Sequence, residues 1–325
     1  MYFCMQITNN AMKKLVSILV PCYNEEASLP TLYEEVRRLM DKETAYDWEL
    51  FFVNDGSRDR TMEIIKELYK KDSRISYVDL ARNFGKENAM LAGFDHVKGD
   101  CMVIMDADLQ DPPSLIPDML KYWEEGYDDV YAKRNSRGKE SWLRRKLSML
   151  FYTILDHSTR YDVLRNVGDF RLLDRSCIEA LKQMRETERN TKGMYSWIGF
   201  RKKGIYYQQK ERQEGQSKWG IMSLINLALN GIMSYTTAPL RLASILGLIV
   251  STVAFAYLIY IIVMTNLYGD PVQGYPTIMV TMLFLGGVQL LSLGILGEYI
   301  ARIFNEVKGR PGYFISSYNG KKTEK

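Results

Sequence analysis

The chain has 325 residues, with 43 Lys or Arg against 39 Asp or Glu, so its formal net charge is only +4. A charge of this size does not indicate nucleic-acid binding, and we expect no nucleic-acid partner. Two histidines exclude a His-rich zinc site, and four widely spaced cysteines do not indicate a disulfide framework. Chemistry in this chain must therefore depend on carboxylates and cations.

The first third of the chain alternates short apolar runs with helical patterns. The apolar runs predict buried strands at 15–20, 48–53, 75–80 and 101–105. Apolar residues spaced three and four apart predict helices at 28–40, at 61–69 and up to about residue 97. This alternation predicts an α/β domain with an open, mostly parallel sheet, whose ligand binds beyond the carboxyl ends of the strands.

A strand-end Asp-x-Asp at 106–108 is the strongest chemical pattern. Alternate residues of a strand face the same side, so Asp106 and Asp108 could share one cation, with Gln110 adding an amide oxygen. A hard divalent ion prefers oxygen ligands and completes its shell with substrate phosphates, which suits a nucleotide diphosphate. An ordinary solvated turn is the alternative; we favour the metal site because other acids also follow strand ends.

Two earlier loops offer groups for a nucleoside. Asp55 could accept hydrogen bonds from a base or ribose, and Gly56 allows a tight turn and close approach of a ligand. Tyr23 offers an aromatic face and Glu25 a polar end group. Taken alone, the Asp55 loop is equally typical of a turn that caps the next helix, with Asp59 or Thr61 as the cap.

The later part of the chain carries membrane-directed patterns. Helical stretches with apolar and basic residues, at 141–160 and 219–235, predict helices on a membrane surface; a surface helix packed on the sheet is an equal alternative for the first. Leu242–Met264 and Thr277–Ile300 are each long enough to cross about 30 Å of hydrocarbon. Lys and Arg flank the outer ends of both runs and are missing between them, so we expect both termini in the cytoplasm. Residues 1–14 show no signal-peptide pattern, which agrees with that orientation.

Four segments together resemble the family 2 glycosyltransferases with the GT-A fold. They are residues 16–25, 53–57, 81–86 and 105–113. With two spans at the C-terminal end, the chain is similar to the polyprenyl-phosphate glycosyltransferases of this family, which include dolichyl-phosphate mannose synthase and bactoprenol glucosyltransferase. The resemblance implies a GT-A domain followed by a two-helix transmembrane domain.

The resemblance also implies roles on the donor side. The groups that would bind the nucleotide sugar are Pro21, Tyr23, Glu25, Asp55, Lys86 and Asp106, with Arg212, Ser217 and Lys218 near the diphosphate. The ion would be Mg²⁺ or Mn²⁺, held by Asp106, Asp108 and Gln110. A guanidinium suits a leaving diphosphate because it offers paired donors, although a basic rim that touches anionic lipid is the alternative for 212–218.

On the acceptor side, the resemblance places Arg134, Arg144 and Ser148 at the lipid phosphate. Residues 166–173 match the family's third acidic segment, so Asp169 is the candidate catalytic carboxylate beside Asp108. A phosphate monoester, with a second pKa near about 6, is already largely dianionic at neutral pH. Asp169 would therefore orient the acceptor or support positive charge developing at the sugar, rather than remove a proton.

These expectations combine into one reaction. A sugar, with glucose favoured, passes with inversion from a UDP-sugar to undecaprenyl or another polyprenyl phosphate, at the cytoplasmic face of the bacterial inner membrane. UDP-N-acetylglucosamine and GDP-mannose are other possible donors. The alternatives are a processive polysaccharide synthase, for which two spans make a poor channel, and a membrane scaffold that binds a nucleotide sugar without turnover. Membrane lipid is an expected partner, and the family implies a homo-oligomer, a tetramer.

The predicted organisation has five parts. An N-terminal extension at 1–14 precedes the catalytic domain at 15–213, and an interfacial helix follows at 214–238. The two transmembrane helices lie within 239–304, and residues 305–325 form a cytoplasmic tail.

Overall fold

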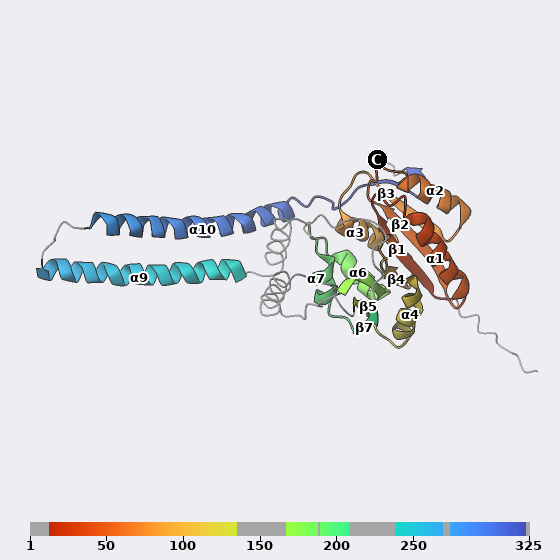
Figure 1. Ribbon diagram of the computed structural model, residues 1–325, viewed down its shortest axis with the longest axis horizontal. Coiled ribbons are helices and arrows are strands. Elements are labelled where there is room, and N and C mark those ends of the chain that lie inside the picture. Colours follow the sequence, from red (N-terminus) through yellow and green to blue (C-terminus); the bar gives the residue numbers. More distant parts are fainter. Residues whose placement is uncertain (1–12, 135–166, 188, 208–237, 269–273, 323–325) are drawn as a thin grey trace, which may run out of the picture. The chain divides into compact units, whose positions relative to one another are not determined.

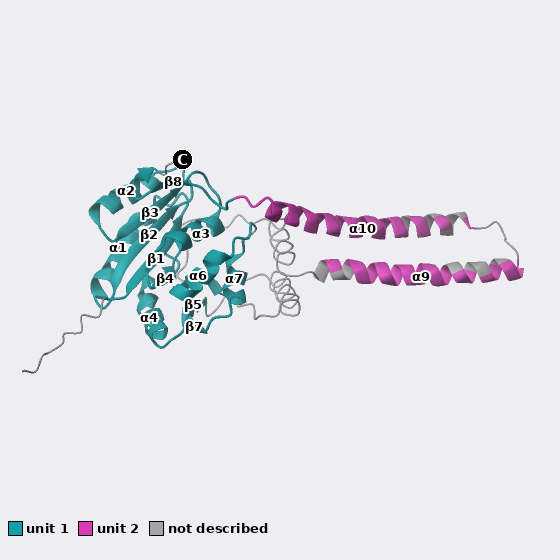
Figure 2. Ribbon diagram, turned by 180° about the vertical axis from the view of Figure 1, so that it is seen from behind, with its two compact units in different colours: residues 1–145, 161–218, 311–325 teal, residues 146–160, 219–310 magenta. Residues whose placement is uncertain are grey.

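The computed structural model describes residues 13–134, 167–187, 189–207, 238–268 and 274–322. The chain divides into two compact units, shown in teal and magenta in Figure 2. The first comprises residues 1–145, 161–218 and 311–325, and the second comprises residues 146–160 and 219–310.

The described part of the first unit is built on a nine-stranded sheet with the strand order β7-β5-β6-β4-β1-β2-β3-β8-β9. The strands are β1 (Leu15–Cys22), β2 (Asp47–Asn54), β3 (Ile75–Leu80), β4 (Cys101–Ile104), β5 (Asp129–Arg134), β6 (Val167–Asp174), β7 (Lys202–Tyr207), β8 (Ile315–Tyr318) and β9 (Lys321–Lys322). In this sheet only β6 and β8 run against the other strands, as their antiparallel pairing with β4, β5, β3 and β9 shows. The predicted α/β class and the mostly parallel sheet are confirmed.

Helices cover both faces of the sheet (Figure 1). One hydrophobic core joins the sheet to α1 (Leu29–Lys42), α2 (Thr61–Lys71) and α4 (Ile116–Glu124), which follows the 3-10 turn η1 (Pro113–Leu115). A second core on the opposite face joins it to α3 (Lys86–His96), α6 (Arg175–Gln183) and α7 (Thr191–Trp197). The three predicted helices of the first third are therefore confirmed as α1, α2 and α3.

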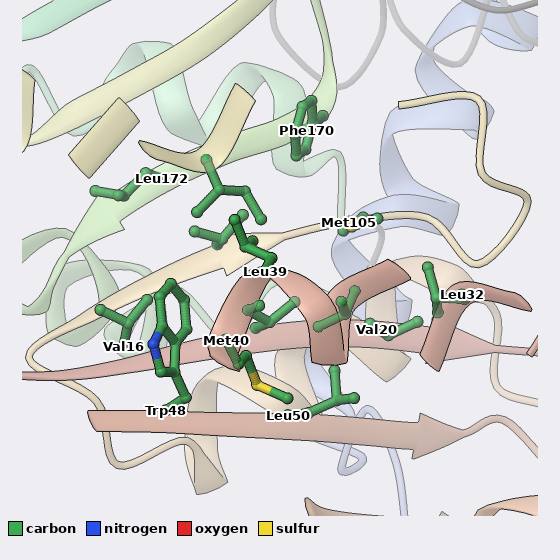
Figure 3. Close-up of a cluster of buried hydrophobic side chains, with 14 of the residues drawn as sticks. Val16, Val20, Leu32, Leu39, Met40, Trp48, Leu50, Met105, Phe170 and Leu172 are labelled. Atoms are coloured by element: carbon green, nitrogen blue, oxygen red, sulfur yellow. The ribbon is translucent and has the colours of Figure 1, made fainter. Parts of the chain in front are cut away.

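Strand periodicity divides the apolar residues between the two cores. In β2, Leu50 and Phe52 belong to the first core, whereas Phe51 and Val53 belong to the second. Figure 3 shows Leu32 and other α1 side chains over the first face. A strand buried on both faces reads as a continuous apolar run, which is why the sequence reveals these strands so clearly.

The segment that follows α10 belongs to the first unit and adds β8 and then β9 beside β3 at one end of the strand order. β8 pairs antiparallel with β3, with Ser317 opposite Asp79, and the Asn319 side chain accepts the backbone N–H of Tyr77 at 2.7 Å. The sequence predicts a cytoplasmic tail at 305–325, and nothing local in it predicts this strand. The reason is that Ile315–Tyr318 contains only two large apolar residues and its pairing partner is more than 200 residues away in sequence.

The described part of the second unit consists of two long helices, α9 (Ala238–Tyr268) and α10 (Tyr275–Val307). Each contains one of the two predicted apolar spans. Within the described residues, the stretch Phe284–Val307 is long and apolar enough to cross a membrane, and Ala243–Tyr257 is a shorter apolar stretch. Helical structure over both predicted spans is thus confirmed, and the crossing of a membrane by both stays a prediction.

Candidate active site

Strand direction gathers the candidate site residues at one edge of the sheet. β1, β2, β3, β4, β5 and β7 point the same way, so their carboxyl ends lie at this edge. β6 is antiparallel to β4 and β5, and therefore its amino end lies there too. Residues far apart in sequence, such as Lys86, Asp106 and Asp169, can meet here for that reason.

Lys86 bridges two carboxylates that come from different strands. Its Nζ lies 2.6 Å from Asp106 Oδ1, just beyond β4, and 2.8 Å from Asp169 Oδ2, near the start of β6. The Asp169 side chain is 9% exposed, whereas those of Lys86 and Asp106 are 41% and 37% exposed. The sequence assigned these three residues to one site, and the structure brings them together.

The bridge controls the ionisation of the buried acid. Burial alone would raise the pKa of Asp169, but the attraction of Lys86, and then of Lys192, outweighs it and holds that pKa below its usual value. Burial likewise favours neutral Lys86, yet Asp106 and Asp169 raise its pKa above the usual value. Asp169 Oδ1 is buried and has no hydrogen-bond partner among the described residues. One oxygen of the carboxylate therefore has unused hydrogen-bonding capacity among the described residues.

A buried ion pair fixes the strand that carries Asp169. Two residues further along β6, Arg171 Nη1 lies 2.9 Å from Asp129 Oδ2, and both side chains are almost fully buried. The Arg171 guanidinium also stacks 3.6 Å from the centre of the Tyr195 ring. Breaking such a pair would leave an uncompensated buried charge, so this network holds β6 against β5 and α7.

Asp55 fastens the loop that delivers Lys86. Its carboxylate is buried and accepts the backbone N–H of Phe84 at 2.7 Å and that of Gly85 at 2.9 Å. Burial raises the pKa of Asp55 despite these two amides. Because Gly85 directly precedes α3, Asp55 sets the position of Lys86 at the start of that helix. A contact of Asp55 with the nucleoside stays a prediction.

The glycine after Asp55 admits protein backbone. Gly56 has φ +63°, and a Cβ there would stand 2.4 Å from the carbonyl carbon of Arg82. The close approach at Gly56 is made by the backbone of the 81–86 loop, and the approach of a ligand there stays a prediction.

The loop after β1 is tied to the loop after β2. Asn24 has φ +55°, and its backbone N–H donates to Ser57 Oγ at 3.0 Å. The N–H of Glu25 donates to Thr61 Oγ1 at 2.8 Å, and Ser28 Oγ donates to the Glu25 carboxylate at 2.6 Å. Pro21 pairs with Val53 in the sheet, while the Tyr23 side chain is 44% exposed. Groups from both loops therefore border the same corner of the site.

The two acids of the Asp-x-Asp pattern do not extend a strand. β4 ends at Ile104, so Asp106 and Asp108 lie in the turn that follows, where Leu109 takes φ +57° and the Gln110 N–H donates to Asp108 Oδ1 at 3.2 Å. The prediction that Asp106 and Asp108 are alternate residues of one strand is wrong, because the ladder of β4 with β1 and β6 ends at Ile104.

The side chains of this turn offer the ligand atoms that a hard divalent ion prefers. They provide two carboxylates and one amide, which are oxygen ligands. In the part of the chain that the structure describes, no group of three or more His, Cys, Asp or Glu residues could hold a metal by itself. An ion here would take its remaining ligands from a diphosphate and water, as Mg²⁺ commonly does.

A second polar cluster borders this turn. Arg134, the last residue of β5, donates from Nε to Tyr207 Oη at 3.3 Å, and the Tyr207 hydroxyl donates to Asp111 Oδ1. Neither Tyr207 nor Asp111 was singled out from the sequence. No local signal places the Tyr207 side chain, because exposure does not alternate along β7.

Several predicted site residues lie outside the described residues. They are Arg144 and Ser148 on the acceptor side and Arg212, Ser217 and Lys218 on the donor side. The predicted interfacial helices at 141–160 and 219–235 also lie outside them. These assignments stay predictions.

Comparisons with known proteins give independent information on ancestry. The family model described as glycosyl transferase family 2 matches residues 17–182, and the model described as the GtrB C-terminal hairpin matches residues 238–303. The CsbB protein of Bacillus subtilis is 45% identical over 94% of this chain and 92% of its own. The prophage-derived bactoprenol glucosyl transferase of Shigella flexneri is 43% identical over 92% of this chain and 97% of its own. The prophage bactoprenol glucosyl transferase homolog of Escherichia coli K12 is 42% identical over 92% and 98%.

Proposed function

Because this chain belongs to glycosyl transferase family 2, we propose that it transfers glucose from UDP-glucose to a polyprenyl phosphate such as undecaprenyl phosphate. Its relatives named bactoprenol glucosyl transferases align over nearly their whole length, including the C-terminal hairpin. The chain is a glycosyltransferase with the GT-A fold, and the identity of donor and acceptor is the proposal. The observation that supports this proposal most is the pair of contacts by which Lys86 joins Asp106 to Asp169 at the carboxyl ends of the parallel strands.

The reaction is a single displacement at the anomeric carbon. An oxygen of the polyprenyl phosphate forms a bond to that carbon while the bond to the β-phosphate oxygen of UDP breaks with its electron pair, so the configuration inverts. The acceptor dianion becomes a phosphodiester with one negative charge, and UDP departs with the charge of the broken bond. No proton has to move, because the acceptor is already largely ionised near pH 7.

Asp169 can then act through its charge. Held ionised by Lys86 and almost buried, it supports positive charge developing at the anomeric carbon or orients a sugar hydroxyl through Oδ1. Lys86 offsets the repulsion between Asp106 and Asp169 and fixes the two acids, which come from neighbouring strands. The Asp55 carboxylate keeps the lysine at that position.

Asp106, Asp108 and Gln110 would hold Mg²⁺ or Mn²⁺, which when bound stabilises the negative charge on the leaving diphosphate. Tyr23 would stack on the base, with Pro21 and Glu25 beside it. Arg212, Ser217 and Lys218 would bind the diphosphate, and Arg144 and Ser148 the acceptor phosphate.

The second unit would act as the anchor. We expect α9 and α10 to cross the bacterial inner membrane, with the first unit and both termini in the cytoplasm, because positive side chains flank only the outer ends of the hairpin. Anchoring keeps the enzyme at the surface where its lipid acceptor lies, and such proximity contributes several kcal/mol to a reaction. A homo-oligomer, tetrameric by family resemblance, is part of the same expectation.

A donor screen tests the proposal. Purified full-length protein is mixed with Mg²⁺, undecaprenyl phosphate and UDP-glucose, UDP-N-acetylglucosamine or GDP-mannose, and the lipid fraction is analysed by mass spectrometry. We expect one hexose on undecaprenyl monophosphate, formed fastest from UDP-glucose, and loss of the product in Asp108→Asn. A ladder of longer glycans would instead indicate a processive synthase. If no donor releases its nucleotide, the enzyme assignment is wrong and the scaffold alternative stands.

A further inference from the structure

We propose that Tyr207 and Asp111 are positioning residues that hold the Arg134 guanidinium for the phosphate of the lipid acceptor. The inference rests on the proposed function and extends it to the side chains of Tyr207 and Asp111. It starts from the chain of hydrogen bonds from Arg134 Nε to the Tyr207 hydroxyl and from that hydroxyl to Asp111.

The strand order places Arg134 on the acceptor side of the reacting carbon. β6, which carries Asp169, lies between β4 and β5 in the sheet. The loops expected to bind the nucleotide follow β1, β2 and β4, whereas Arg134 ends β5 beyond β6. An inverting displacement needs the attacking oxygen opposite the leaving group, so a cation across β6 from the diphosphate suits the acceptor.

Arg134 also lies close to the catalytic acid. A Cβ built on Gly168, the residue before Asp169, would come 3.5 Å from Arg134 Nη2. An acceptor dianion brought to this position would be repelled by the ionised Asp169. The guanidinium offsets that repulsion and can offer paired Nη donors to phosphate oxygens.

The Tyr207 hydroxyl lies between Arg134 and Asp111. It holds the arginine through hydrogen bonds and not through a direct ion pair with the carboxylate. Tyr207 is 7% exposed and pairs in register with Arg134 between β7 and β5, so its hydroxyl has little freedom. The hydroxyl accepts a hydrogen bond from the Nε–H of Arg134 and donates one to Asp111, whose side chain is 4% exposed. Fixing a flexible side chain before binding saves the entropy that binding would otherwise cost.

The same chain of bonds connects the two halves of the site. Asp111 ends the turn that carries Asp106, Asp108 and Gln110 on the donor side. The bonds through Tyr207 to Asp111 therefore fix the distance between the Arg134 guanidinium and the turn that would hold the leaving diphosphate. This geometry aligns nucleophile and leaving group across the sugar, which is what a near-attack arrangement requires.

The substitution Tyr207→Phe removes only the hydroxyl. In full-length protein we expect the KM for undecaprenyl phosphate to rise about tenfold, the usual effect of losing a hydrogen bond to a charged group, with the KM for UDP-glucose changed less than about twofold. The control is Tyr206→Phe, its neighbour on β7, whose side chain is 63% exposed and should leave both constants unchanged. Tyr207→Phe also leaves the buried Asp111 carboxylate without its hydrogen bond, so we expect its melting temperature to fall by a few degrees, whereas Tyr206→Phe should melt like the unchanged protein.

Coupling and direct binding make the test specific. In an Arg134→Lys background, which lacks Nε, the effect of Tyr207→Phe should disappear. Binding of farnesyl phosphate by calorimetry, which needs no turnover, should weaken about tenfold in Tyr207→Phe. The inference is overturned if acceptor affinity is unchanged, if the donor KM rises instead, or if the effect persists in the Arg134→Lys background. Failure of the unchanged protein to glycosylate any lipid would overturn the proposed function, whereas the farnesyl phosphate result would still decide the role of Tyr207.

Discussion

Lys86→Met is the substitution whose consequences the structure defines best. Methionine keeps most of the length of the side chain and removes the ammonium that lies 2.6 Å from Asp106 and 2.8 Å from Asp169. Removing one partner of a fully buried ion pair costs about 3–5 kcal/mol. Lys86 and Asp106 are 41% and 37% exposed, so water replaces part of the lost interaction, and we expect a loss of about 2 kcal/mol in the free energy of unfolding. For a unit of this size that corresponds to a melting temperature lower by roughly 4–8 °C.

The pH dependence gives this prediction its sign. In the unchanged protein the pKa of Asp169 is below its unfolded value of about 3.9, so its contribution to stability is present above that pH and is lost as the pH falls through the folded pKa. Without Lys86, burial dominates and raises the pKa of Asp169, so the charged carboxylate becomes a cost at neutral pH that acid relieves. The stability difference between the two proteins should therefore be largest near pH 7, and should start to shrink above about pH 4, as the pH falls through the raised pKa of Asp169 in Lys86→Met.

The assay is thermal unfolding in detergent from pH 7 to pH 3.5, together with turnover at pH 7, which should fall on the order of 100-fold. Lys66→Met, at an exposed position of α2, is the matched control and should change neither property. If Lys86→Met melts at the same temperature as the unchanged protein, or lower by the same amount at every pH, Lys86 is not the counterion of Asp169.

Three further predictions concern the loops around this lysine. Gly56→Ala should destabilise the first unit by about 3 kcal/mol, since it combines a positive φ with a Cβ 2.4 Å from the Arg82 backbone. The control is Gly126→Ala, at φ +89° and with the nearest atom beyond its chain neighbours 3.7 Å from the added Cβ, which should cost only about 1–2 kcal/mol. Equal melting temperatures of the two variants would show that the contact with Arg82 adds nothing. Asp55→Ala should free the amides of Phe84 and Gly85, lower kcat at least tenfold and speed hydrogen exchange at 81–86. Exchange as slow as in the unchanged protein would contradict the positioning role of Asp55. Removal of residues 311–325 should expose the edge of β3 and lower the melting temperature, because β8 and the bond from the Ala81 N–H to the Phe314 carbonyl are lost; an unaltered melting curve would show that the segment contributes nothing to the fold.

The sequence reveals the parts of the fold that depend on local pattern. β1 to β4 are apolar on both faces and lie between helices with regular spacing, so their runs could be located to within one or two residues. β5 to β9 depend on pairing between distant segments, and β8 on a partner more than 200 residues away. No periodicity within such short segments specifies those partners.

The candidate site divides in the same way. The acids could be chosen from the sequence because carboxylates that follow buried strands are unusual and chemically informative. Their partners could not: that Lys86 joins Asp106 to Asp169 follows from β6 lying antiparallel beside β4, and that Asp55 binds the 84–85 amides follows from the path of a loop. The end of β4 at Ile104 likewise depends on where its ladder with the neighbouring strands stops.

Binding of Mn²⁺ in the presence and absence of UDP, followed by electron paramagnetic resonance, tests the central claim most directly. That claim is that Asp106 and Asp108 together hold a divalent ion that also binds the leaving diphosphate. We expect one ion per chain, bound much more tightly with UDP than without it, and at least a tenfold weaker UDP-dependent site in Asp108→Asn. If Asp108→Asn binds Mn²⁺ and UDP as tightly as the unchanged protein, the ion does not sit on this turn.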